Sequence, residues 1–416
     1  MPKDNVIQLK KEPFIDDPIT DILRSGARKL LAEALEAEIE TFISQYRDLK
    51  DDRDHRRIVR NGHLPERDIQ TGIGPVPVKV PRARDRQPEE GSEPIRYHSS
   101  LLPRYLRKTK SMEELIPWLY LKGISTNDFS EALSALVGKD GPGLSAPTIS
   151  RIKAIWKEDL EKWQKRDLTH KRYVYIWADG VYCNVRLEEK QCLLVIIGST
   201  EDGKKELLAL DSGFRESELS WTDILLDLRR RGLKVPPELA IGDGALGFWK
   251  ALAKVYGKTR RQRCWVHKTA NILNKLPKSM QAKAKEKIHQ IWMAPDKAES
   301  QRCFDDFINL YEAKYPKAVE CLQKDREALL TFYDFPAEHW KHIRTTNPIE
   351  STFSTVRLRT DKVRSCFSPK TVVTMAFKLC QCAQKRWQRL HSHKQLAKVI
   401  KGVRFIDGIE EIRNAA

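Results

Sequence analysis

The first 50 residues carry apolar side chains at steps of three and four, with acidic residues between them. The apolar positions are Ile19, Ile22, Leu23, Ala27, Leu30, Leu31, Leu35, Ile39 and Phe42. This spacing predicts an amphipathic helix from Asp17 to about Asp48. Because the other face is acidic, we expect the helix to contact a partner helix or a second copy of the chain rather than a polyanion.

Two short segments with different patterns follow this helix. Residues 51–66 are rich in charge and poor in apolar side chains, so we expect a basic loop. Residues 71–86, TGIGPVPVKVPRARDR, alternate valine with glycine and proline, which predicts a short edge strand or hairpin. The arginine-rich end of this segment suits either a contact with phosphate or a solvated linker.

Helical spacing returns over residues 103–165. Within them, GISTNDFSEALSALVG followed by GPGLSAPTISRIKAIWKEDLEKW indicates a helix-turn-helix, with Ser145 as the N-cap of the second helix. Thr148, Ser150 and Arg151 would then project where a recognition helix meets a groove of DNA. A helical hairpin without a DNA contact is the alternative.

The middle of the chain changes to strand patterns. Three β-rich runs, KRYVYIWADGVYCNVR, QCLLVIIGST and KKELLALDSG, are joined by short polar turns. A helix at about Glu218–Arg231, a short strand ELAIGDG and a helix ALGFWKALAKVYG come next, which predicts a mixed α/β layer. The chain from Lys268 to about Tyr333 is almost wholly helical and interrupts that layer as an insertion. From Asn347 onward the pattern is helical again, and basic.

The net charge of +18 is concentrated in particular segments. Residues 251–290 contain eleven Lys or Arg against one acid, and residues 341–416 contain sixteen against five, whereas residues 1–100 are nearly balanced. Such segments indicate a polyanion partner such as nucleic acid, although a ribosome- or membrane-associated basic protein would share them. No apolar run approaches the roughly 20 residues that span a bilayer, and no signal peptide is visible, so we expect a cytoplasmic protein. The eight cysteines include no CxxC pair, which suggests neither a disulfide framework nor a complete zinc module.

Two aspartates end neighbouring predicted strands. Asp179 follows the apolar run VYIWA, Asp243 follows LAIG, and each precedes a glycine. Carboxylates that converge above one sheet edge repel unless a cation lies between them, and oxygen ligands suit Mg²⁺ or Mn²⁺. Either Asp-Gly alone is as well explained by a turn. Together, at the ends of buried strands, they favour a metal site.

Glu350 has two interpretations. In TTNPIES, Asn347 as N-cap, Pro348 at the first helical position and Glu350 at the third form a capping box, which would explain the glutamate without chemistry. A first-turn glutamate is also placed rigidly enough to bind a metal. Arg357 lies seven residues on, on the same helix face, where its charge would suit phosphate.

Four segments together carry a family resemblance: ADGVYCNVR, AIGDGALGFWKAL, RCWVHKTANILNKLP and TTNPIESTFSTVRLRT. Over residues 17–389 the chain resembles the mutator-type transposases of bacterial insertion sequences, the IS256 family. The resemblance implies an RNase H-like core with an Asp-Asp-Glu triad and an all-helical insertion between the second Asp and the Glu. The triad falls on Asp179, Asp243 and Glu350, and the basic residue expected two turns beyond the glutamate falls on Arg357.

The same resemblance includes a Cys-x-x-His pair, matched by Cys264 and His267. Two ligands do not complete a zinc site, so packing or hydrogen bonding beside the active site is the alternative to metal binding. Trp265 between them either belongs to the core or stacks on an unpaired base at a transposon end. Further basic residues of the Arg357 segment are expected to hold the DNA backbone: Arg359, Lys362 and Arg364.

The expected fold class is α/β, an RNase H-like core with an all-helical insertion, preceded by helical N-terminal and helix-turn-helix DNA-binding regions. The expected segments are 1–100, for dimerisation and DNA contact; 101–166, helix-turn-helix-like; 167–262, the first part of the core; 263–340, the insertion; and 341–416, the last part of the core with basic helices. The resemblance implies a DNA transposase that nicks and joins strands at the ends of a mobile element.

The cofactor implied by the resemblance is Mg²⁺, as two ions for which Mn²⁺ can substitute, bound by the triad. The partners implied are double-stranded DNA, as terminal inverted repeats and target, and a second copy of the chain in a synaptic complex, with no membrane. Such a protein would act in the cytoplasm, at the bacterial nucleoid. Two rival interpretations remain. Another RNase H-like nuclease or a retroviral-type integrase would share the triad but lack the insertion, and a DNA-binding regulator would not need the triad.

Overall fold

The computed structural model describes residues 18–88, 93–112, 115, 146–186, 189–213, 215–362 and 369–411. By its internal contacts the chain divides into two compact units, Met1–Ser150 and Arg151–Ala416. Within the described residues, no helix combines the length and apolarity needed to cross a membrane.

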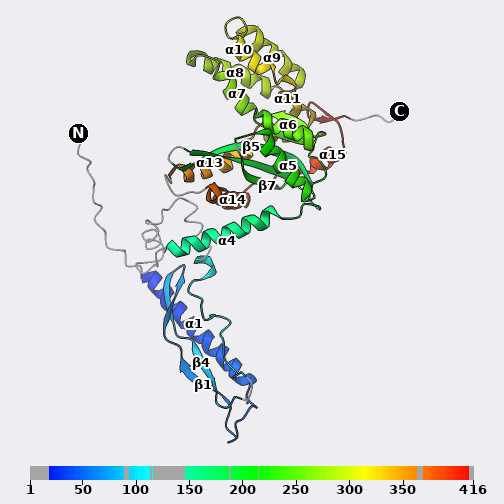
Figure 1. Ribbon diagram of the computed structural model, residues 1–416. Helices are drawn as coiled ribbons and strands as arrows, with labels where there is room; N and C mark the ends of the chain where they lie inside the picture. The colour runs from blue at the N-terminus through cyan, green and yellow to red at the C-terminus, as the bar shows by residue number, and fades with distance from the viewer. Residues whose placement is uncertain are drawn as a thin grey trace, which may run out of the picture. The chain divides into compact units, whose positions relative to one another are not determined.

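The N-terminal unit consists of one long helix and two small antiparallel sheets. The helix α1 (Pro18–Gln45) confirms the predicted amphipathic helix. Strand β1 (Ile58–His63) pairs with β4 (Pro81–Asp85), and β2 (Arg67–Thr71) pairs with β3 (Gly74–Val78). Figure 1 shows α1 running alongside these strands. The core of the unit contains Leu35, Ile69, Val76, Val78, Val80 and Leu102.

The two halves of α1 differ in burial. Leu35 and Ile39, in the second half, are 1% and 0% exposed and contribute to the core. Ile22 and Leu30, in the first half, are 71% and 67% exposed. The exposed apolar positions fit the expectation that this helix contacts a partner, which stays a prediction.

The basic loop expected at residues 51–66 is wrong in its second half, because β1 lies there. Backbone pairing with β4 holds this strand, with Ile58 opposite Asp85 and Val59 opposite Arg84. Most of its side chains are exposed, so no alternation of apolar residues marks it. The hairpin predicted over residues 71–86 is partly confirmed: β3 is its first strand, although its partner β2 precedes it.

The first helix of the expected helix-turn-helix lies outside the described residues. The second is α4 (Ala146–Gln164), and Thr148, Ser150 and Arg151 lie in its first two turns. Their side chains are outside the described part of the chain, so their DNA contacts stay a prediction. Further along the helix, Trp156 and Leu160 are buried.

The C-terminal unit is built on a five-stranded sheet with the order β7-β6-β5-β8-β9. Strands β5 (Tyr173–Arg186), β6 (Glu189–Thr200) and β7 (Lys205–Gly213) form an antiparallel meander. Strands β8 (Leu239–Gly242) and β9 (Arg260–Arg263) then run parallel to β5. The runs predicted for β5 to β8 are confirmed. Strand β9 was missed because its sequence, RRQR, has no apolar residue.

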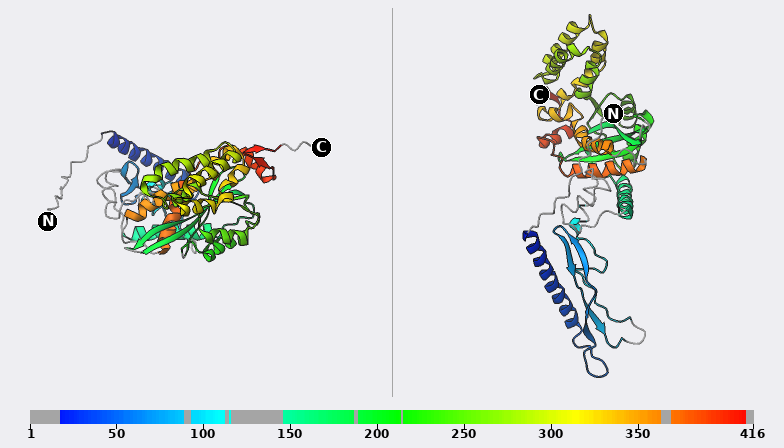
Figure 2. Two further views of the ribbon diagram at one scale, coloured as in Figure 1. Left: turned by 90° about the horizontal axis from the view of Figure 1, so that it is seen from above. Right: turned by 90° about the vertical axis from the view of Figure 1, so that its left-hand side faces the viewer.

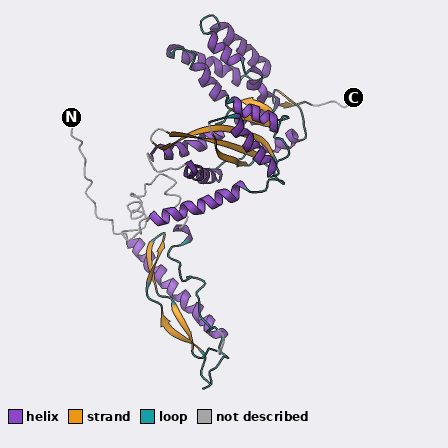
Figure 3. Cartoon of the chain, viewed as in Figure 1, coloured by secondary structure: helices purple, strands orange, loops and turns teal. Residues whose placement is uncertain are grey.

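Helices cover both faces of this sheet (Figure 3). On one face lie α5 (Glu218–Arg230) and α6 (Leu246–Val255), which both match predicted helices. On the other, α13 (Asn347–Lys362) packs against β5 and α14 (Pro369–Gln384) packs against β7. The α5/α6 face buries Leu194, Ile196, Trp221, Leu225, Phe248 and Leu252. The mixed α/β fold expected from the sequence is therefore present.

Between α6 and α13 the chain forms the predicted helical segment. It contains α7 (Trp265–Leu273), α8 (Lys278–Met293), α9 (Lys297–Tyr311), α10 (Pro316–Gln323) and α11 (Arg326–Leu330). In Figure 1 most of these helices gather at one end of the unit, beyond the sheet. Short turns return the chain to the sheet: η1 (Thr331–Asp334), η2 (Ala337–His339) and α12 (Trp340–Ile343).

The segment after α14 is only partly helical. It contains η3 (His393–Gln395) and α15 (Leu396–Ile400). A short hairpin of two two-residue strands, β10 (Phe405–Ile406) and β11 (Ile409–Glu410), follows. The expectation of helix throughout is thus wrong at this end. Gly408, with φ +80, supplies the left-handed turn residue that closes the hairpin. Figure 2 shows the C-terminal unit from two further directions.

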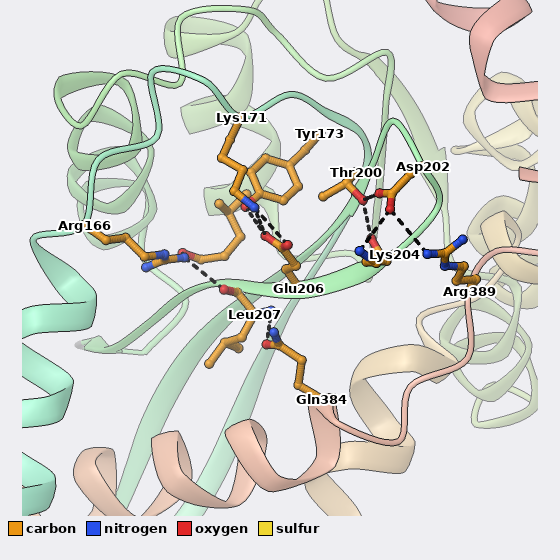
Figure 4. A network of polar contacts seen from close by, with 11 residues as sticks. Arg166, Lys171, Tyr173, Thr200, Asp202, Lys204, Glu206, Leu207, Gln384 and Arg389 are labelled. Atoms are coloured by element: carbon orange, nitrogen blue, oxygen red, sulfur yellow. Dashed lines mark hydrogen bonds and ion pairs between the residues drawn. The ribbon is translucent and has the colours of Figure 1, made fainter.

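Strand β7 lies at the edge of the sheet, and side chains satisfy part of its outer backbone (Figure 4). Arg166 donates to the carbonyl oxygens of Leu207 and Leu208, both at 3.0 Å. The backbone N–H of Leu207 donates to Oε1 of Gln384 at 2.9 Å. These bonds protect the edge against pairing with another strand.

Candidate active site

The strand register brings the first two predicted acids together. The last parallel pair between β5 and β8 is Ala178 opposite Gly242. Asp179 occupies the next position in β5, and Asp243 directly follows β8, so both acids lie at the point where these two neighbouring strands stop pairing. Asp243 ends its strand as predicted. Asp179 does not, because β5 continues for seven more residues in antiparallel pairing with β6.

The glycines after these aspartates each leave room for a neighbouring side chain. Gly180 lies inside β5, and a Cβ atom there would overlap the side chain of Glu216. A Cβ atom at Gly244 would overlap the guanidinium of Arg263. Both glycines therefore allow another side chain to approach the backbone closely. The position inside β5 removes the turn as the explanation for Asp179-Gly180, whereas Asp243-Gly244 does form a turn, because Oδ1 of Asp243 accepts from the N–H of Ala245 two residues on.

Asp179 is the most enclosed of the three predicted acids, with 5% of its surface exposed. Burial raises the pKa of its carboxyl to about 7, an effect that the charge of His267 opposes and the charges of Asp243 and Glu350 reinforce. Asp179 is thus electrostatically coupled to both other acids. Oδ1 of Asp243 accepts a hydrogen bond from the Ala245 N–H at 2.9 Å, which orients that carboxylate at the start of α6.

Glu350 lies in the first turn of α13. The helix begins at Asn347, and the carbonyl of Thr346 accepts from the backbone N–H groups of Ile349 and Glu350. Oε1 of Glu350 lies 3.4 Å from Oγ1 of Thr346 and 3.5 Å from Nε2 of His267. Its side chain is therefore engaged with the residues around Asp179. The predicted capping box is wrong, because Thr346 and not Asn347 holds the N-cap position, and Asn347 is already the first helical residue.

Cys264 and His267 form a hydrogen-bonded group with the start of α13. The Cys264 sulfur accepts from the backbone N–H and the hydroxyl of Thr346, both at 3.3 Å. Its backbone N–H donates to the carbonyl of Gly242 at 2.8 Å, so it links the end of β8 to α13. The hydrogen-bonding role expected for this pair is present. Cys264, His267 and Glu350 also offer three ligand atoms within 4.8 Å of one another.

The surroundings of His267 favour its charged imidazolium form. Its hydrogen bond with Cys264 raises the pKa of the imidazole to about 9, against the effect of burial, and the charges of Cys264, Asp179 and Glu350 raise it further. An imidazolium beside three carboxylates offsets part of their repulsion. It lies 3.5 Å from the Glu350 carboxylate and, with Thr346, holds the same oxygen of that side chain.

Trp265 does not present a face for stacking on a base. It is 0% exposed, and its indole N–H donates to the carbonyl of Leu329 at 2.9 Å. The base-stacking interpretation is therefore wrong, and the core interpretation is correct. Trp265 is the first residue of α7, and its backbone N–H donates to the carbonyl of Arg344 at 3.0 Å.

The expected DNA-contacting residues of α13 are described only in part. Arg357 has an exposed side chain two turns beyond Glu350. Arg359 and Lys362 lie on the same helix, but their side chains are outside the described part of the chain, and Arg364 is outside it altogether. Their contacts with a DNA backbone stay predictions.

A fourth carboxylate, Glu216, was not predicted from the sequence. It lies between β7 and α5, directly before the N-cap Ser217. Burial raises the pKa of its carboxyl to about 7, with further increases from the charges of Asp243 and Asp179. The number of residues between Glu216 and the other acids matches no sequence motif that would have predicted a shared site. Only the mid-strand glycine at position 180, which makes room for it, points toward it.

Comparison with known proteins gives one consistent result. Residues 3–389 match the profile of the family described as "Transposase, Mutator family". The transposase for insertion sequence element IST2 of Acidithiobacillus ferrooxidans is 50% identical over 286 residues, which are 67% of this chain and 95% of that protein. The transposase for insertion sequence element IS6120 of Mycolicibacterium smegmatis is 48% identical over 298 residues, covering 71% and 92%.

More distant similarities extend the comparison. The transposase for insertion sequence element IS256 in transposon Tn4001 of Staphylococcus aureus is 30% identical over 319 residues, 75% of this chain and 77% of that protein. Among solved structures, the Drosophila P element transposase strand transfer complex gives a TM-score of 0.26 at 11% identity, over 70% of this chain and 90% of that one. Since the profile spans most of the sequence and two relatives approach half identity over nearly their whole length, the chain belongs to the Mutator family of transposases.

Proposed function

We propose that Asp179, Asp243 and Glu350 form a divalent-metal active site that nicks and joins DNA strands at the ends of a mobile element. One observation carries this proposal. The register of β5 and β8 sets the two aspartates side by side, and Glu350 is coupled to Asp179 through charge from α13. Membership of a transposase family makes DNA the substrate.

The donor set fits Mg²⁺ or Mn²⁺. All three side chains offer carboxylate oxygens, the ligands that these hard cations prefer. When bound, two such ions would activate the attacking oxygen and stabilise the leaving oxygen of an in-line displacement at phosphorus. Asp179 is coupled to both Asp243 and Glu350, so it is the best placed to bridge two ions.

The reaction needs no covalent bond to the protein. Attack by water breaks one phosphodiester and leaves a 3′-hydroxyl, and attack by that hydroxyl on a second phosphodiester joins the strands. The residues of this chain hold the reacting groups in place for both steps. His267 orients Glu350, and Arg357 supplies an exposed positive charge on the same helix for the DNA backbone.

The topology supports an RNase H-like core as the finer fold assignment. An antiparallel meander followed by two parallel strands, with helices on both faces, is consistent with that core. The helical segment α7–α11 falls between Asp243 and Glu350, where the resemblance expects an insertion. A retroviral-type integrase would lack this segment.

We further propose that the N-terminal unit contacts double-stranded DNA. It contains a hollow of about 810 Å³ on the side of β4. Five arginines line it: Arg67, Arg82, Arg84, Arg96 and Arg104. The one acid that lines the hollow, Asp85, is paired with Arg57 at 2.8 Å, so the positive charge of the five arginines remains available for phosphate.

The exposed apolar half of α1 supports a homodimer as the form that holds the two ends of the element.

A single substitution tests the active site. Asp179→Asn should retain binding to terminal inverted repeats in gel shifts but abolish Mg²⁺-dependent nicking of a labelled end. Asp223→Asn, an exposed aspartate on α5, is the matched control and should change neither binding nor nicking. Robust nicking by the Asp179 variant would sink the assignment. End binding without any nicking by the unaltered protein would instead favour the DNA-binding regulator.

A further inference from the structure

The side chain of Glu216 lies directly over the backbone of the strand that carries Asp179. A Cβ atom at Gly180 would come within 2.6 Å of Oε1 of Glu216 and would overlap its Cγ and Cδ atoms. The carboxylate therefore occupies the space that any other residue at position 180 would fill. Gly180 directly follows Asp179 in β5, so the Glu216 carboxylate lies against the backbone next to the most enclosed acid of the proposed site.

The backbone around Glu216 is held as tightly as its side chain. A Cβ atom at Gly247, in α6, would overlap the carbonyl oxygen of Glu216 and lie 2.8 Å from the backbone nitrogen of Glu218. Ser217 then caps α5 by accepting from the N–H of Ser220 at 3.2 Å. Because α6 begins just after Asp243, the same packing fixes Glu216 relative to that aspartate.

The carboxylate of Glu216 is only partly satisfied. Its Oε2 atom is fully enclosed and has no hydrogen-bond partner among the described residues. A buried oxygen of this kind costs free energy unless something binds it. In the part of the chain that the structure describes, Asp179, Asp243 and Glu216 form no ion pair with lysine or arginine, and the Arg263 guanidinium beside Gly244 pairs with Asp325 instead. His267 supplies the positive charge that lowers the pKa of Asp179 and the pKa of Glu216.

We propose that Glu216 is a fourth carboxylate ligand of the divalent-metal site, on the side of Asp243. The inference rests on the proposed function, since it adds a ligand to the same site. Four carboxylates against one imidazolium leave a deficit of positive charge that two divalent cations would offset. The enclosed Oε2 atom would then gain the partner that it lacks.

Metal binding, rather than activity, separates this role from a structural one. Binding of Mn²⁺ to the full-length protein would be measured by isothermal titration calorimetry for the unaltered protein, Glu216→Gln, Asp179→Asn and Glu218→Gln. Glu216→Gln is expected to weaken Mn²⁺ binding by about tenfold or more, as losses around metal sites commonly do. Glu218→Gln is the matched control, two residues away and paired with Lys254 on the surface, and should bind as the unaltered protein does.

A second measurement guards against a simple folding defect. In EDTA, Glu216→Gln should melt at or above the temperature of the unaltered protein, because it removes an unpartnered buried carboxylate. Its rise in melting temperature on adding Mn²⁺ should be smaller. Gly180→Ala provides an independent variant, since the added methyl group displaces the Glu216 carboxylate without removing it, and it should also weaken Mn²⁺ binding.

The outcomes distinguish the two proposals. Mn²⁺ binding by Glu216→Gln equal to that of the unaltered protein, with binding abolished in Asp179→Asn, would overturn the role of Glu216 alone. Unchanged binding in both variants would overturn the proposed active site as well. A lower melting temperature of Glu216→Gln in EDTA would assign the residue a structural role and overturn the inference.

Discussion

Asp179 in β5 and Asp243, directly after β8, each lie one residue beyond the parallel pair formed by Ala178 and Gly242. This relationship depends on β8 ending where β5 continues. Beyond that point the backbone of β5 has β6 on one side and no strand on the side of β8. The start of α13, joined to the end of β8 through Cys264, brings Glu350 to the same place.

The enclosed carboxyl of Asp179 makes the stability of the metal-free protein depend on pH. Its pKa is about 7 when folded, against about 4 in an unfolded chain, so the folded state binds the additional proton between these values. The contribution of this group to stability is therefore fully present below about pH 4 and is lost as pH rises through 7.

Asp179→Asn removes this dependence because the amide does not titrate. In EDTA at pH 8, we expect the variant to be more stable than the unaltered protein, by at most about 4 kcal/mol for a shift of this size. The difference should shrink at pH 5. Urea denaturation of both proteins at the two pH values measures the gain in free energy of unfolding caused by the substitution. A gain at pH 8 that is no larger than the gain at pH 5 would contradict an enclosed Asp179 that ionises in the folded protein.

Trp265 is expected to matter for stability and not for DNA binding. Trp265→Phe removes the indole donor and leaves a gap in the core, while Gln262 still donates to the carbonyl of Leu329. The free energy of unfolding should fall by about 1–3 kcal/mol, mainly through the lost packing. Affinity for a labelled element end should not change. Weaker end binding with an unchanged denaturation midpoint would restore the base-stacking interpretation.

The differences between expectation and structure have identifiable causes. The strands β5 to β8 were predictable because their cores are continuous apolar runs, buried on both faces between helices. Strand β9 was not, because it consists of polar residues held by parallel pairing with β8. Likewise β1 exists through its pairing with β4 and not through its own pattern.

The site shows the same limit. Asp179 and Asp243 could be placed together from apolar runs that stop at each of them, although only pairing with β6 reveals that β5 continues. Glu350 needed the family resemblance, since its position in the helix equally suits a cap. Glu216 is separated from the other acids by irregular spacing, and only the packing of α5 and α6 against the sheet brings it to them.

The arginine-lined hollow of the N-terminal unit predicts a salt-dependent contribution to DNA binding. Arg82 and Arg84 both have exposed side chains there. Replacing both with glutamine should weaken binding to duplex DNA and reduce the slope of log affinity against log salt by about 0.9 for each phosphate that the protein no longer neutralises. Fluorescence anisotropy between low and moderate salt gives this slope.

Arg53→Gln provides the control, since this exposed arginine is in the same unit but does not line the hollow. It should leave the salt slope unchanged. Equal slopes for the double variant and the unaltered protein would remove the hollow from the DNA-binding surface.

The most direct test of the proposed active site is a change of metal preference at Asp179. Thiolate ligands bind Mn²⁺ more readily than Mg²⁺, so Asp179→Cys should change which ion supports strand nicking. Nicking of a labelled element end would be measured with each ion for the unaltered protein, Asp179→Cys and Asp179→Asn. The account predicts that both variants are inactive with Mg²⁺ and that Asp179→Cys recovers activity with Mn²⁺ while Asp179→Asn does not. Nicking by Asp179→Cys with Mg²⁺ at the rate of the unaltered protein would contradict it.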